Sequence, residues 1–172
     1  PRGDRRSAGD FRMDRRQQRK RKGRRMNELQ ALYQEVLLDH YRSPRNRGHL
    51  AAATGRAEGH NPLCGDRIAV EVDVQGERLQ GVAFDGAGCA ISTASASLMT
   101  EAVAGRTEAE IAVLFDQFRK AVTGDPAADV EPLGKLAVLC GVKDFPMRVK
   151  CATLAWHTLL AALAGGDKVS TE

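Results

Sequence analysis

The sequence predicts an α+β fold, in which a small antiparallel sheet is followed by helices that cover one of its faces. Three observations lead to this prediction. Residues 67–74 alternate polar and apolar side chains, which is the pattern of a half-buried strand. Gln75-Gly76-Glu77 provides a turn, and the apolar segment 79–84 provides a return strand. From residue 91 onward, apolar residues recur at helical spacing.

The remaining elements follow from the same periodicities. A helix is expected from Met26, because apolar residues return every three or four positions until Pro44 stops the pattern. Segment 57–60 is a candidate third strand, and Gly165-Gly166 closes the last helix. The later helices are expected over residues 91–103, 111–118, 133–139 and 145–164.

The charge of the chain is unevenly distributed. The formal net charge of the 172 residues is +4, but residues 1–25 hold twelve Lys or Arg and three Asp, a net of +9. The rest of the chain therefore carries 4 − 9 = −5. This distribution argues against a nucleic-acid-binding function, because the body is acidic and the basic segment holds a single aromatic residue, Phe11.

The domain organisation follows from the hydrophobic pattern. Residues 1–25 lack hydrophobic periodicity and are expected to be a disordered basic extension, residues 26–166 the folded domain, and residues 167–172 a C-terminal tail. The extension has three interpretations: a start codon assigned too far upstream, a cloning artefact, or a native basic arm. The first two are favoured. Neither a secretory signal nor a membrane span is recognisable, so a reducing, cytoplasmic location is expected.

The segment Asn61-Pro62-Leu63-Cys64-Gly65-Asp66 places a thiol and a carboxyl group two positions apart, just before a strand. In extended backbone such residues lie on the same side, and the glycine between them permits conformations that other residues resist. Cys64 and Asp66 are therefore candidate ligands of one metal ion. Alone, a structural cysteine and a turn-forming aspartate are the simpler interpretation. His60 is a possible substitute ligand, although a solvated loop histidine is favoured.

Two further cysteines lie near the expected starts of helices. Cys89 follows Gly86-Ala87-Gly88, where free N–H groups and the helix dipole favour a thiolate. The alternative is a small buried residue at a tight turn. Cys151 shares a face of small residues with Arg148, which would allow other elements to approach closely. Cys140 has no such neighbours and is expected to be a buried, inert thiol.

Four motifs stand out together: Asp39-His40-Tyr41-Arg42-Ser43-Pro44-Arg45-Asn46, Asn61-Pro62-Leu63-Cys64-Gly65-Asp66, Gly86-Ala87-Gly88-Cys89-Ala90-Ile91-Ser92, and Cys151 at the head of an apolar helix. Over residues 26–166 the chain resembles the U-type iron–sulfur cluster assembly family, which includes SufU, IscU and the N-terminal domain of NifU. The resemblance implies an α+β domain with a three-stranded antiparallel sheet. It also implies a metal site formed by Cys64, Asp66, Cys89 and Cys151.

Two departures from IscU-type sequences resemble the SufU branch of the family. Lys150 stands before Cys151, where IscU-type members have a histidine, and the separation 151 − 89 = 62 leaves room for an added helix. This resemblance implies a zinc-containing sulfur acceptor for a SufS-type cysteine desulfurase, working with the downstream SUF assembly machinery. Whether this makes it an enzyme, a zinc-dependent sulfurtransferase, stays open. A scaffold that assembles a [2Fe–2S] cluster is the alternative.

The ligand chemistry agrees with zinc. Three thiolates and one carboxylate suit a tetrahedral zinc site, and the same ligands generally bind zinc more tightly than ferrous iron. With Zn²⁺ the four groups would sum to −2, and Arg148 and Lys150 are expected to offset this charge and to meet an acidic patch on a partner. Arg67 is a third cation near in sequence that could offset it. Cys64 is the expected sulfur acceptor, because its glycine-containing loop should be the most mobile. No nucleic-acid or membrane partner is expected.

Overall fold

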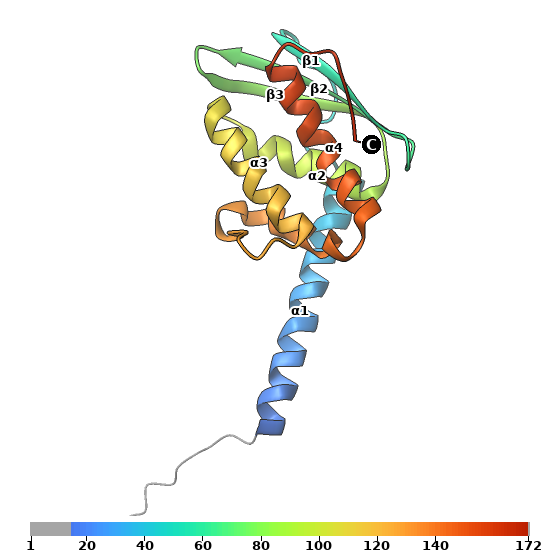
Figure 1. Cartoon of the computed structure of the whole chain (residues 1–172), viewed down its shortest axis with the longest axis vertical. Helices are drawn as coiled ribbons and strands as arrows, with labels where there is room; N and C mark the ends of the chain where they lie inside the picture. Colours follow the sequence, from blue (N-terminus) through green and yellow to red (C-terminus); the bar gives the residue numbers. More distant parts are fainter. Residues whose placement is uncertain (1–14, 172) are drawn as a thin grey trace, which may run out of the picture. The chain divides into compact units, whose positions relative to one another are not determined.

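The computed structural model describes residues 15–171, and it describes side chains from residue 28 onward. The chain divides into two units after Tyr33, and helix α1 (Arg15–Arg42) runs from the first into the second. The fold described below is that of the second unit, residues 34–171 (Figure 1). Among the described residues, no helix combines the length and the apolar character that crossing a membrane requires.

The second unit is built on a four-stranded sheet with the order β3-β2-β1-β4. Its strands are β1 (Gly55–Asn61), β2 (Asp66–Gln75), β3 (Arg78–Ala87) and β4 (Lys168–Ser170). β1 and β3 pair antiparallel with β2, while β4 pairs parallel with β1. Along β2 every second residue is buried, from Ile68 to Val70 to Val72, so the predicted alternation places one face of the sheet in the core.

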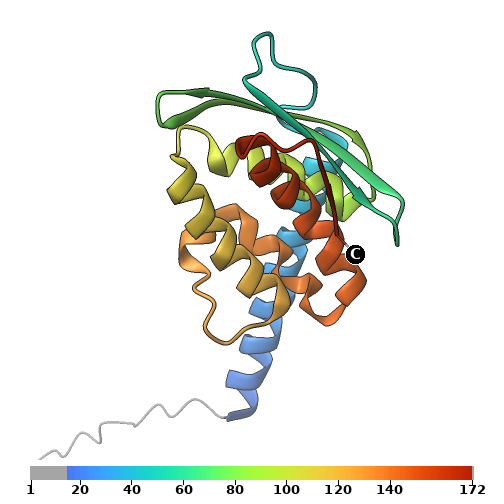
Figure 2. The ribbon, with the colours of Figure 1, turned by 45° about the horizontal axis from the view of Figure 1, so that its top comes forward.

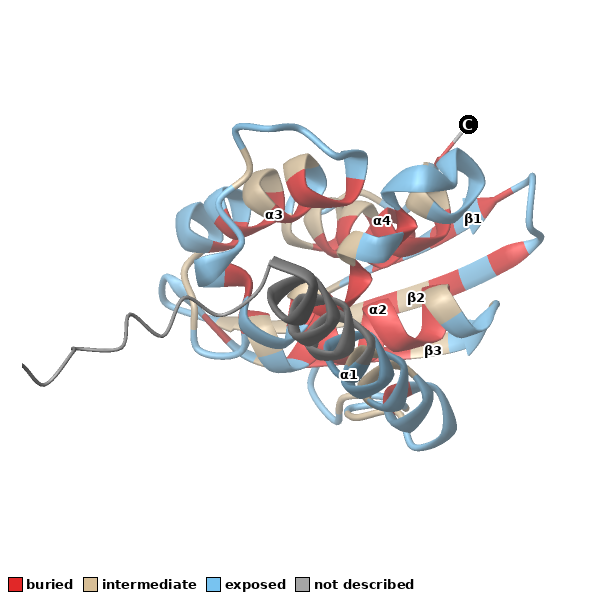
Figure 3. Cartoon of the chain, turned by 90° about the horizontal axis from the view of Figure 1, so that it is seen from below, coloured by how far each residue is buried: buried red, intermediate tan, exposed pale blue. Residues whose placement is uncertain are grey.

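Helices lie on the side of that inner face (Figure 2). α2 (Ala90–Val103) and α4 (Pro146–Leu163) contact the strands, and α3 (Glu108–Thr123) and the 3₁₀ segment η1 (Glu131–Asp144) pack against these helices. α4 contacts β1, β2 and α2, and buried residues follow α2, α4 and the facing strands (Figure 3). This confirms the predicted α+β arrangement, with helices on one face of the sheet. The sheet has four strands rather than the three antiparallel strands that the resemblance implies, because β4 adds a parallel pair at the β1 edge.

A glycine allows α4 to lie close to β1. A Cβ atom on Gly59 would overlap the hydroxyl oxygen of Thr158 and would stand 3.1 Å from a methyl group of Leu154. Farther along α4, Trp156 stacks between Phe115 and Phe118 of α3, with ring centroids 5.5 Å and 5.0 Å apart. These contacts fix α4, which carries Cys151, between the sheet and α3.

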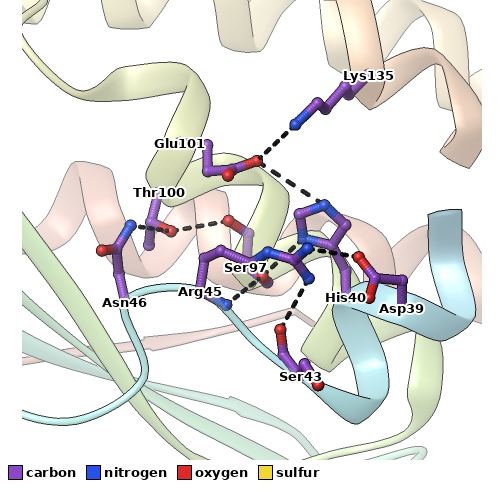
Figure 4. A network of polar contacts seen from close by, with 9 residues as sticks. All are labelled: Asp39, His40, Ser43, Arg45, Asn46, Ser97, Thr100, Glu101 and Lys135. Atoms are coloured by element: carbon purple, nitrogen blue, oxygen red, sulfur yellow. Dashed lines mark hydrogen bonds and ion pairs between the residues drawn. The ribbon is translucent and has the colours of Figure 1, made fainter.

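The motif at the end of α1 attaches the chain to α2 (Figure 4). The buried ring of His40 is hydrogen-bonded through Nδ1 to Ser97 Oγ at 2.8 Å, and the backbone N–H of Arg45 donates to the same oxygen at 2.8 Å. Asn46 Nδ2 donates to Thr100 Oγ1 at 3.0 Å. Within the described structure, His40 therefore has a structural role, and it supports the helix whose first residue follows Cys89.

The structure differs from the sequence predictions at three places. α1 begins at Arg15 rather than at Met26, so residues 15–25, expected to be disordered, are helical; Arg, Lys and Gln all favour a helix. The same expectation for residues 1–14 lies outside the described residues. Residues 168–170, expected in a tail, form the fourth strand, and the division of the chain into domains at residues 25 and 166 stays a prediction. The short helix over 133–139 is a longer 3₁₀ segment interrupted at Gly134, whose φ is 52°.

Candidate metal site

Cys64 lies in the turn between β1 and β2. Asn61 and Asp66 are the last paired residues of this hairpin, and the backbone N–H of Gly65 donates to the Asn61 carbonyl oxygen at 2.8 Å. Gly65 has a φ of 73°, a left-handed conformation that favours glycine. The tight turn leaves the Cys64 side chain exposed.

Asp66, the first residue of β2, is buried, with 3% of its surface exposed. Its Oδ1 accepts a hydrogen bond from the backbone N–H of Cys89 at 2.9 Å. Its Oδ2 is also buried and has no hydrogen-bond partner among the described residues. A buried carboxylate oxygen without a donor is costly, so it is a position where a cation would be stabilising.

Cys89 is the N-cap residue of α2, as the sequence predicts. Its sulfur accepts from the backbone N–H of Ser92 at 3.4 Å, and the side chain is exposed. Because its own backbone N–H donates to Asp66, the β3–α2 turn is tied to the start of β2. The last cysteine of the predicted set, Cys151, lies one turn into α4 and is buried.

Three of the predicted ligands come together directly. The sulfur atoms of Cys64 and Cys151 are 3.0 Å apart. One ligand atom from each of Cys64, Asp66 and Cys151 lies within 4.8 Å of the others, although 87 residues separate the two cysteines along the chain. Cys89 is not in this group of three, but it adjoins the group through its bond to Asp66.

The acidity of the thiols reflects this crowding. Burial raises the pKa of the Cys151 thiol, and its hydrogen bond with Cys64 and the negative charges of Cys89 and Asp66 raise the pKa further. Burial also raises the pKa of the Cys89 thiol, against the opposing effect of the Ser92 N–H. Without a cation these groups resist ionising together, whereas a bound metal would displace their protons. Thiolate and carboxylate donors are ligands that zinc takes.

Other candidate residues lie around or away from this cluster. Arg148 is exposed, with its guanidinium carbon 4.6 Å from the centre of the Phe145 ring, and Lys150 is half-buried. Arg67 and His60 line a cavity of about 670 Å³ on the outer face of the sheet, and neither belongs to the group of three ligands. Cys140 is half-buried in η1 rather than buried, and it is also outside that group.

Sequence reasoning missed the role of Asn61, which it treated only as part of a motif. Asn61 is fully buried, and its side-chain Nδ2 donates to the sulfur of Cys151 at 3.6 Å. The Asn-Pro pair that precedes Leu63 is a signal for an Asx turn, so the local bond from the Leu63 N–H to Asn61 Oδ1 was within reach of the sequence. The bond to Cys151 was not, because it joins residues 90 positions apart.

Comparison with known proteins shows the family of the chain. Residues 32–152 match the model of the NifU-like N-terminal domain family. The zinc-dependent sulfurtransferase SufU of Bacillus subtilis is 39% identical over 136 residues, which cover 79% of this chain and 92% of that protein. The iron–sulfur cluster assembly scaffold protein IscU of Streptococcus pyogenes is 39% identical over 138 residues, which cover 80% of this chain and 86% of that protein.

A solved structure gives the same result for the fold. A proposed iron–sulfur cluster assembly scaffold protein for the SUF system, from Fervidobacterium islandicum, superposes with a TM-score of 0.71 at 34% identity. The alignment covers 75% of this chain and 94% of that one. The chain therefore belongs to the NifU-like N-terminal domain family, the U-type iron–sulfur cluster assembly proteins.

Proposed function

We propose that this chain is a SufU-type, zinc-dependent sulfur acceptor for a cysteine desulfurase. One observation carries the proposal: an exposed thiol and a buried thiol lie 3.0 Å apart, beside a buried carboxylate oxygen that has no partner among the described residues. Zinc held by Cys64, Asp66, Cys89 and Cys151 would keep the thiols deprotonated and join the three segments that carry them. The name of the SufU relative, zinc-dependent sulfurtransferase, supports the same assignment.

Cys64 is the proposed acceptor. It is exposed on a hairpin turn, whereas Cys151 is buried on α4. The Cys64 thiolate attacks the terminal sulfur of a persulfide on the desulfurase, so that a new S–S bond forms on Cys64 while the S–S bond of the partner breaks. The partner cysteine leaves as a thiolate and takes up a proton, and no external oxidant or reductant is consumed.

Exposed side chains next to the site suit a protein partner. Leu63, Phe145 and Met147 are 54%, 49% and 51% exposed. Leu63 directly precedes Cys64, and Phe145 and Met147 lie at the start of α4, the helix that carries Cys151. Arg148 and Lys150 add positive charge on the same turn of α4, which is suited to an acidic surface. We propose a SufS-type desulfurase as this partner, in the cytoplasm, with sulfur passed on to the SUF assembly machinery.

The test is to mix the zinc-loaded chain with a SufS-type desulfurase and cysteine, alkylate the thiols, and locate the added sulfur by mass spectrometry. We expect the persulfide on Cys64. The chain should also accelerate the turnover of cysteine by the desulfurase. Cys64→Ala should abolish this acceleration while leaving partner binding intact. Cys140→Ala, which changes a half-buried thiol outside the site, should preserve the acceleration. Sulfur found on Cys151 or Cys140, with Cys64 unmodified, would refute the relay.

A scaffold for a [2Fe–2S] cluster is the second candidate, because the same thiols are suitable ligands and the Streptococcus pyogenes relative is named a scaffold. The cluster would then be the cargo of the site. Metal analysis of protein purified without added metal separates the two functions. About one zinc per chain is expected for the sulfur acceptor, and a coloured iron–sulfur species with little zinc would favour the scaffold.

A further inference from the structure

Asn61 connects the two thiols at the centre of the site. It is the last residue of β1, and none of its surface is exposed. Its side-chain Nδ2 donates to the sulfur of Cys151 at 3.6 Å, and its side-chain Oδ1 accepts from the backbone N–H of Leu63 at 3.1 Å. Its backbone carbonyl accepts from the N–H of Gly65 at 2.8 Å.

These three bonds have a simple geometric consequence. Leu63 and Gly65 are the residues on either side of Cys64, so Asn61 holds the turn on both sides of the exposed thiol. The same side-chain amide reaches the buried thiol of Cys151, which is 90 residues away in the sequence. One buried residue therefore fixes both the position of Cys64 and the surroundings of Cys151.

We propose that Asn61 is the positioning residue that determines which thiol is retained and which is released. The inference rests on the proposed zinc-dependent sulfur acceptor. The Asn61 amide donates to the Cys151 sulfur and would hold that sulfur in position as a metal ligand, as hydrogen bonds from residues behind a ligand commonly do. Cys64 lacks an N–H donor of this kind among the described residues and is held through the backbone of its turn. Cys151 is thus the retained ligand, and Cys64 is the one free to react.

The two roles of Asn61 can be separated by substitution. Asn61→Ser keeps an oxygen that can accept from the Leu63 N–H, but its side chain is too short to reach the Cys151 sulfur. Asn61→Asp keeps both the accepting oxygen and the shape of the side chain, but it replaces the N–H donor by negative charge near the thiols. Asn61→Ala removes both side-chain bonds. The Gly65 bond, which is made to the backbone, survives in all three variants and serves as an internal reference.

Two measurements on the full-length chain test the proposal. The first is zinc affinity by competition with a chelator, without any desulfurase. Loss of a hydrogen bond to a metal ligand typically lowers affinity by about 10–100-fold, and we expect this for Asn61→Ser and a larger loss for Asn61→Asp. Asn46→Asp is the matched control, because it makes the same exchange at a hydrogen-bonding amide that donates to Thr100, away from the site. Its zinc affinity should be unchanged.

The second measurement is amide hydrogen exchange at residues 63 and 65. In Asn61→Ala the Leu63 amide should exchange about tenfold faster, while Gly65 keeps more of its protection. In Asn61→Ser both amides should stay near their wild-type rates although zinc affinity falls. Unchanged zinc affinity in Asn61→Ser and Asn61→Asp would overturn the role of the amide, even if Cys64 accepts sulfur normally. A fall in zinc affinity together with no sulfur transfer to wild-type Cys64 would leave this role intact and refute the proposed function instead.

Discussion

Replacing Asp66 by asparagine should change stability in opposite directions with and without zinc. The asparagine side chain would keep an oxygen to accept from the Cys89 N–H, which Asp66 Oδ1 does at 2.9 Å. It would also replace Oδ2, which has no hydrogen-bond partner within residues 28–171, by an uncharged amide group. An unsatisfied buried polar atom costs about 1–3 kcal/mol, more if it is charged, so the metal-free variant should be more stable than wild type by about 1 kcal/mol. For a domain of this size that is roughly 3 °C in melting temperature.

The zinc-loaded comparison should have the opposite sign. If Asp66 is a ligand, its loss should weaken zinc binding by at least about 100-fold, and the stabilisation by zinc should fall by about 2.7 kcal/mol at a fixed zinc concentration. Thermal unfolding of wild type and Asp66→Asn, each with a chelator and with excess zinc, gives all four values. If Asp66→Asn lowered the melting temperature equally in both conditions, Asp66 would have a structural role that is independent of metal.

Three further predictions concern the thiols, the extension and the pH dependence of stability. Cys89→Ser and Cys151→Ser should lower the melting temperature of the zinc-loaded protein, whereas Cys140→Ser should change it little; the reverse order would mean that the ligands are wrongly assigned. A chain beginning at Met26 should bind zinc and accept sulfur as well as the full chain, which metal analysis and desulfurase assays can check. Burial, helped by the nearby Arg45 charge, lowers the pKa of His40 below 6.5, so the unfolded chain takes up this proton more readily than the folded one. This imidazole should therefore reduce stability as pH falls from about 6.5 toward its lower folded value and have no effect above 6.5. Comparing denaturant unfolding of metal-free wild type and His40→Gln across that range isolates the slope, and equal slopes would contradict the assignment.

The periodic elements of the fold could be predicted from the sequence because each depends on local pattern. The alternation at 67–74 and the turn at Gln75-Gly76-Glu77 give the β2–β3 hairpin, and the apolar stripe of 145–164 gives α4. β4 could not be predicted, because a three-residue strand has too little pattern and its parallel pairing with β1 depends on tertiary contacts. The early start of α1 was missed because residues 15–25 lack hydrophobic periodicity, although Arg, Lys and Gln have high helix propensity.

The site was predictable in composition but not in geometry. Local pattern made Cys64, Asp66 and Cys89 candidates, and the family resemblance implied the full set with Cys151; the structure places ligand atoms of Cys64, Asp66 and Cys151 within 4.8 Å of one another. The surroundings of Asp66 Oδ2, which lacks a partner in the described part of the chain, and the bond of the Asn61 amide depend on how β1, β2 and α4 pack together. Residue spacing in the sequence does not contain that information. Arg67 was expected to offset the charge of the site because it is next to Asp66 in sequence. Alternation along β2 instead places Arg67 on the outer face of the sheet, opposite Asp66.

The close approach of α4 to β1 at Gly59 means that the separation of the two thiols is controlled from a distance. Gly59 lies two residues before Asn61, and Thr158, which its missing Cβ accommodates, lies seven residues after Cys151 on α4. A side chain at position 59 would force Thr158 to shift, and any part of that shift taken up by α4 would move Cys151 away from the hairpin that bears Cys64. Pairing such a side chain with a smaller residue at 158 would restore the fit. The sulfur–sulfur distance can therefore be adjusted from residues that touch neither sulfur, and sulfur transfer can be measured as a function of that spacing with every ligand left in place.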